Sequence, residues 1–139
     1  MATRAYSEAP LGIELPERYR LVRRMAHGGM ASVWCGQDLL LDRPVAIKLM
    51  TEQLAADETA VRRFRREALA AARLSGHTNV VTIYDVGQSA SPDSSSPGRP
   101  FIVMERMLGG TVADANRAST VPPTRAVKWL REASAAVDY

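Results

Sequence analysis

Three residues of this sequence, two glycines and a lysine, are suited to holding a phosphate group, and a glutamate that could pair with the lysine follows them. Gly28 and Gly29 stand side by side in MAHGGMASVW, between two apolar runs. Lys48 follows twenty positions after Gly28, and Glu67 follows nineteen positions after Lys48. A glycine-rich turn can present backbone N–H groups to an anion, and an ammonium group adds positive charge. The combination predicts a phosphate site, whereas a glycine pair alone is more often only a hairpin turn.

Lys48 lies in the apolar run RPVAIKLM (43–50), which predicts a strand. Side chains alternate along a strand, so Val45 and Ile47 should face one side of the sheet and Ala46 and Lys48 the other. An ammonium group beside Ala46 on the inner side of a sheet requires an anion. A lysine on an exposed strand requires none, and that alternative stays open from the strand alone.

Glu67 lies in the stretch 57–75, which predicts a helix with Asp57 as its N-cap. At 100° per residue the apolar positions form one arc of this helix, and Glu67 falls inside the arc. A carboxylate on an apolar face is costly unless it is paired, so we expect an ion pair with Lys48 if the helix packs over the sheet. The alternative is a slightly turned helix whose Glu67 reaches water. The arc comprises Ala60, Val61, Phe64, Ala68 and Ala71.

The remaining elements place these residues in a sheet. Short β-type runs joined by polar turns predict an antiparallel meander, followed by the helix and two more strands. A stretch rich in Ser, Pro and Gly (88–100) is expected to be a mobile loop between the last two strands. Two helices should follow, a weak one and a stronger amphipathic one. The expected strands are 19–26, 31–38, 43–50, 79–87 and 100–107, and the expected final helices are 111–119 and 123–139.

Composition narrows the function classes. The chain has 139 residues, of which 46% are hydrophobic and 24% charged, as in a small globular domain. The net charge of +3 is slight and its arginines cluster on one helix, which favours a solvated face and no nucleic-acid partner. The single cysteine, Cys35, allows no internal disulfide, and with His27 and His77 it cannot form a zinc site, so no metal is expected. No apolar run could cross a membrane and no signal peptide is evident, so we expect a cytoplasmic chain, with any anchor of the parent protein in a later segment.

The glycine turn, the strand with Ala-x-Lys and the helix with its glutamate occur in the order of the protein-kinase small lobe. From about Arg18 to Tyr139 the chain resembles the bacterial, eukaryotic-like serine/threonine protein kinases. The similar segments are RYRLVRRMAHGGMASVWCGQD, RPVAIKLM, FRREALAAARLSGHTNVVTIYDVG and FIVMERMLGGTVAD. The resemblance implies an α+β fold, in which a five-stranded antiparallel sheet with one packed helix precedes a hinge and the first helices of the large lobe. It implies a flexible segment 1–17, a small lobe and hinge over 18–107, and an incomplete start of the large lobe over 108–139.

The resemblance also implies roles for single residues. Lys48 and Glu67 are the expected catalytic residues, Lys48 holding the α- and β-phosphates of ATP and Glu67 orienting Lys48. Met104 corresponds to the gatekeeper behind the adenine. The expected nucleotide-binding residues are the loop Ala26, His27, Gly28, Gly29, Met30 and Ala31, then Val33 and Ala46 on either side of the adenine, and the backbone of Glu105 and Met107 at its edge. The family pattern is G-x-G-x-x-G, and Ala26 and Ala31 replace its outer glycines, which is expected to reduce nucleotide affinity.

The 139 residues contain no His-Arg-Asp and no Asp-Phe-Gly motif, so the chain looks truncated before the catalytic loop, and the ligands of Mg²⁺ would lie beyond residue 139. We therefore expect the ATP-binding lobe of a kinase that phosphorylates Ser or Thr of protein substrates, inactive by itself. Two alternatives remain. One is a non-catalytic, pseudokinase-like module that binds nucleotide or docks on a kinase. The other is a small-molecule kinase with the same lobe.

Overall fold

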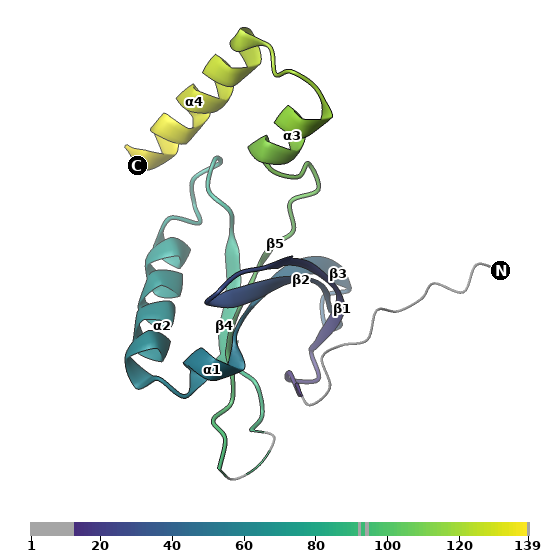
Figure 1. The fold of residues 1–139 in the computed structure, drawn as a ribbon, viewed down its shortest axis with the longest axis vertical. Coiled ribbons are helices and arrows are strands. Elements are labelled where there is room, and N and C mark those ends of the chain that lie inside the picture. The colour runs from purple at the N-terminus through teal and green to yellow at the C-terminus, as the bar shows by residue number, and fades with distance from the viewer. Residues whose placement is uncertain (1–12, 92, 94, 139) are drawn as a thin grey trace, which may run out of the picture.

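The computed structural model describes residues 13–91, 93 and 95–138, so most of the expected flexible segment 1–17 lies outside the described residues. A five-stranded sheet is flanked by a long helix, and two further helices follow beyond one end of the sheet (Figure 1). The strands are β1 (Tyr19–His27), β2 (Ala31–Asp38), β3 (Arg43–Met50), β4 (Ile83–Gln88) and β5 (Pro100–Glu105). The helices are α1 (Glu52–Ala55), α2 (Glu58–Arg73), α3 (Val112–Ala118) and α4 (Pro123–Val137).

The sheet has the order β1-β2-β3-β5-β4 and is antiparallel throughout, as predicted. Its first and last strands curl toward one another. The hydroxyl of Tyr19 on β1 donates to Oδ2 of Asp85 on β4 at 2.6 Å, and the Tyr19 ring meets the edge of Phe101 at 6.0 Å. Burial of Tyr19 and its bond to Asp85 raise the pKa of the phenol. The curled sheet therefore encloses one apolar core inside itself.

That inner core lies on the face opposite α2. It contains Val45 and Ile47 of β3, both fully buried, as the predicted alternation requires. Its members are Tyr19, Trp34, Val45, Ile47, Leu49, Phe101 and Val103. A second core forms where α2 and α1 cover the other face, and it comprises Ala31, Met50, Ala55, Phe64, Ala68 and Ile102. Helix α2 lies beside the sheet (Figure 1). Phe64 and Ala68 are the residues of α2 in the second core.

Helix α2 begins where predicted because Asp57 caps it. The Asp57 carboxylate accepts from the N–H groups of Thr59 at 2.9 Å and Ala60 at 3.2 Å, two donors that have no partner within the helix. The helix ends at Arg73, slightly before the expected boundary at 75. The one-turn helix α1 was not predicted, because four residues are too few to show helical periodicity.

The turn between β2 and β3 depends on a buried carboxylate. Arg18 donates to Asp38 through Nε at 3.1 Å and Nη2 at 2.9 Å, and the N–H groups of Leu40 and Leu41 each donate to Oδ1 at 3.1 Å. The hydrogen bonds from Arg18, followed by those from the turn, lower the pKa of Asp38 to about 2. Asp38 thereby ties the start of β1 to the β2–β3 turn.

Several predicted boundaries differ in the structure, and the start of β4 differs most. Strand β4 starts at Ile83 rather than at 79, because residues 77–80 form turns and bends and residues 81–82 are irregular. The side chain of Asn79 donates instead to the carbonyl of Glu132 on α4 at 2.8 Å. Helix α3 is capped by Thr111 and Asp114 in a reciprocal capping box. Helix α4 keeps its predicted apolar positions, but these are left uncovered by the described residues, and Leu130 is 68% exposed.

Candidate functional site

Four of the predicted nucleotide residues share one face of the sheet. Residues paired directly across antiparallel strands project to the same side. Val33, Lys48 and Ile102 form one such row across β2, β3 and β5, and the next row toward the hinge contains Cys35, Ala46 and Met104. Ile102 and Met104 belong to the core under α2, so both rows lie on the α2 face. The structure thus brings Val33, Ala46, Lys48 and Met104 together.

The glycine pair forms the turn of the β1–β2 hairpin. Gly28 donates its N–H to the carbonyl of Ala31 at 3.0 Å, which closes the turn between His27 and Ala31. Neither Gly28 nor Gly29 has a positive φ, and an added Cβ at Gly29 would meet nothing within 4 Å. The turn therefore needs no glycine for its conformation. The two glycines leave the backbone of the turn without side chains. Ala26, Met30 and Ala31 lie beside them in the sequence.

Lys48 is a half-buried cation with no anionic partner among the described residues. Its Nζ lies 5.9 Å from the centre of the Phe64 ring. A half-buried ammonium group is stabilised when an anion approaches it. The lysine is positioned to receive a phosphate or a carboxylate.

The prediction that Lys48 and Glu67 form an ion pair is wrong: Glu67 pairs with Arg63. The Glu67 carboxylate lies 3.6 Å from Nε of Arg63 one turn earlier, and the Glu67 side chain is 62% exposed. The reason is the rotation of α2. Phe64 and Ala68 are its buried residues, and Glu67 stands about 60° from Phe64 on the side away from Ala68, at the margin of the arc. Water and Arg63 satisfy Glu67 there, as the alternative of a slightly turned helix requires.

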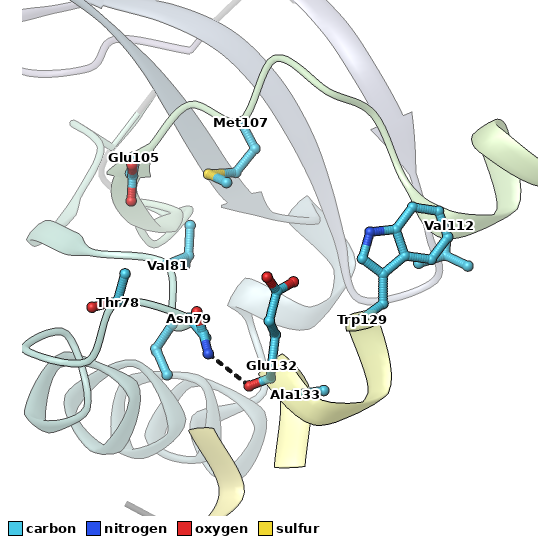
Figure 2. Close-up of a pocket in the computed structure, with 10 residues that line it drawn as sticks. Thr78, Asn79, Val81, Glu105, Met107, Val112, Trp129, Glu132 and Ala133 are labelled. Carbon is cyan, nitrogen blue, oxygen red and sulfur yellow. Dashed lines mark hydrogen bonds between the residues drawn. The ribbon is translucent and has the colours of Figure 1, made fainter. Parts of the chain in front are cut away.

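The predicted hinge residues Glu105 and Met107 lie at the end of β5 and just after it. Glu105 donates its N–H to the carbonyl of Thr82 at 2.8 Å, and its carboxylate accepts from the Thr82 N–H at 3.3 Å. Met107 is 63% exposed. Both side chains line a groove of about 400 Å³ between the hinge, residues 78–81 and helix α4, with the ring of Trp129 at one side (Figure 2). Lys48 and the glycine turn are not among the lining residues, so the predicted residues fall into two places.

The sequence analysis did not place two residues that lie on the α2 face of the sheet, Cys35 and Arg23. Cys35 is 3% exposed and continues the alternation that begins at Val33, so the strand pattern could have placed it. Arg23 pairs with Cys35 on β1, and its Nη2 lies 3.5 Å from the cysteine Sγ. No pattern could have placed Arg23, because register shifts interrupt the alternation of β1 on both sides of it.

The described residues were searched for a metal site and for a membrane-spanning helix. Within residues 13–91, 93 and 95–138, no three His, Cys, Asp or Glu side chains gather as a metal site would require. A search of the same residues for a helix long and apolar enough to cross a bilayer finds none.

Comparison with known proteins finds relatives of this chain. No family model matches the chain. It is 36% identical over 126 residues to the serine/threonine-protein kinase PknB of Mycobacterium leprae, a match that covers 90% of this chain and 20% of the relative. It is 38% identical over 126 residues to PksC of Streptomyces coelicolor, covering 87% of this chain and 22% of PksC. It is 39% identical over 118 residues to PknL of Mycobacterium tuberculosis, covering 84% of this chain and 28% of PknL.

Solved structures give the same result for the fold. A crystal structure of a mutant form of the Mycobacterium tuberculosis PknI kinase domain superposes with a TM-score of 0.70 at 25% identity, covering 88% of this chain and 48% of that one. Another PknI kinase-domain structure superposes with a TM-score of 0.70 at 26% identity, covering 92% and 49%. The chain spans between a fifth and about three tenths of the curated relatives and about half of the solved kinase domains. The chain is therefore homologous to the amino-terminal part of bacterial serine/threonine protein kinases, and it has the fold of the small lobe of a kinase domain with two helices after it.

Proposed function

We propose that the α2 face of the sheet binds ATP, and that this chain is the nucleotide-binding lobe of a kinase that transfers the γ-phosphate to Ser or Thr of proteins. One observation carries the proposal. Lys48 is half-buried and has no carboxylate partner among the described residues, and it shares its face with Val33 and Ala46. The apolar pair is suited to a flat base and the cation to its phosphates.

No three His, Cys, Asp or Glu side chains of the described residues lie close enough together to bind a metal ion such as Mg²⁺. What its own residues can do is bind and orient a nucleotide. Backbone N–H groups near Gly29 are suited to the terminal phosphates, because Gly29 has no side chain and a Cβ added there would meet nothing within 4 Å. Lys48 adds its positive charge from strand β3 on the same face of the sheet.

Calorimetric titration with ATP tests the proposal. A charge-assisted hydrogen bond contributes about 1.5–3 kcal/mol, so K48A should weaken ATP binding by about tenfold to a hundredfold. Lys128 is the only other lysine of the sequence, and it lies on α4 beside Glu132, so K128A is the matched control and should bind like the unmodified chain. Equal affinities of K48A and K128A would remove Lys48 from the site, and no heat at millimolar ATP would remove the site itself.

One observation favours a second candidate, a pseudokinase-like module that binds nucleotide without turnover. Glu67 pairs with Arg63 and does not orient Lys48. An assay for ADP release in the presence of Mg²⁺ and a generic protein substrate tests the second candidate. Turnover that K48A abolishes would overturn it, whereas ATP binding without turnover is expected of both candidates, because the first is a lobe that is inactive by itself.

A further inference from the structure

We infer that Arg23 is a second cation of the nucleotide face and contacts the base and ribose end of the ligand. The inference rests on the proposed function, whose phosphate contacts it leaves with Lys48. Neither Arg23 nor Lys48 has a carboxylate of the described residues within ion-pair distance. Two such cations on one face favour a ligand that is anionic at one end and rich in π-electrons or hydroxyl groups at the other.

The register of the sheet places Arg23. It is paired with Cys35, which is paired with Ala46, which is paired with Met104. The guanidinium leans along this row, since its Nη2 lies 3.5 Å from Sγ of the buried Cys35. Arg23 therefore covers the β1 end of the row that includes Ala46.

The position along the strands decides which part of a nucleotide Arg23 can reach. The row of Lys48 and Val33 is two residues away along β2 and β3, which corresponds to about 7 Å. The row of Lys48 lies nearer the glycine turn and that of Arg23 nearer the hinge. A nucleotide with its phosphates at Lys48 would extend its base and ribose toward Ala46 and Arg23. A guanidinium can stack on the face of a purine and donate to ribose hydroxyl groups.

The chain contains a matched control beside this residue. Arg24 is the next residue of β1 and carries the same charge, but it pairs with Trp34, which belongs to the core on the other face. Both arginines are exposed on an edge strand. A general electrostatic effect on an anionic ligand should be similar for both, whereas a contact requires Arg23 alone.

Titration of the unmodified chain, R23A, R23K and R24A with ATP, ADP and adenosine tests the inference. We expect R23A to lower the affinity for all three ligands by a common factor of about threefold to tenfold, because the lost contact is to the adenosine part that they share. R24A should change each affinity by less than about twofold. R23K should fall between the unmodified chain and R23A, because lysine keeps the charge and loses the planar group.

The outcomes separate this inference from the proposed function. K48A should weaken ATP far more than adenosine, so the two variants have different ligand profiles. R23A that matches R24A, or that weakens ATP and leaves adenosine unchanged, overturns the role of Arg23 while the ATP site stands. An unmodified chain that binds none of the three ligands overturns both.

Discussion

Removal of the Phe64 ring should detach helix α2 from the sheet more than any other single truncation on that helix. Phe64 is 3% exposed, and it packs among Met50, Ala68 and Ile102 under the helix. Replacing a buried phenylalanine with alanine loses the transfer free energy of the ring and leaves a cavity, at a cost of about 3–5 kcal/mol. The neighbours cannot fill that space without moving the helix backbone, because Ala68 is itself too small. A small domain is stable by only about 5–15 kcal/mol, so F64A should lose a large fraction of its stability.

Urea denaturation followed by circular dichroism measures this loss. About 2.1 cal/mol/K of unfolding entropy per residue makes 3–5 kcal/mol equivalent to a fall in Tm of about 10–17 °C for 139 residues. L69A is the control, since Leu69 lies on the same helix at 59% exposure and should change stability by less than about 0.5 kcal/mol. If F64A does not fold, F64L keeps most of the apolar volume and should lose about 1.5 kcal/mol. A loss below about 1 kcal/mol in F64A, with an unchanged m-value, would refute the packing of α2 described above.

Two further variants, D38N and D57A, test the carboxylates that hold the β2–β3 turn and cap α2. D38N should destabilise the protein at neutral pH and flatten its acid dependence, because the carboxylate stabilises the fold above its ordinary pKa of 3.8 and loses this effect as the pH falls toward about 2. Unfolding midpoints from about pH 5 to pH 2 check this against D42N on the same turn, and parallel curves for both would contradict it. D57A should cost about 1 kcal/mol in urea denaturation and D57S only a part of that, because serine can still cap α2. An unchanged midpoint in D57A would mean that the cap contributes nothing.

The secondary structure could be predicted from the sequence because its signals are local. Strands β2 and β3 lie at 31–38 and 43–50 as predicted, and Asp57 caps α2 as its side-chain chemistry suggests. The opposite faces of Ile47 and Lys48 follow from strand alternation alone. The faces of β3 therefore needed no knowledge of the tertiary structure.

The contacts of charged side chains could not be predicted in this way. Glu67 stands at the margin of an apolar arc, where a small rotation of the helix decides between Lys48 and solvent. That rotation is set by how Phe64 and Ala68 pack against β5, which no local pattern contains. Register shifts in β1 likewise decide that Arg23 lies on the α2 face of the sheet and Arg24 on the opposite face.

The sequence by itself determined on which strands Val33, Ala46 and Lys48 lie and which of them share a face, because propensity, capping and alternation act over a few neighbouring residues. The tertiary structure alone decided which cations of the site face have no carboxylate partner among the described residues. Ion pairs depend on the distances between side chains from different elements, and those distances are fixed only when the sheet has curled and α2 has packed on it.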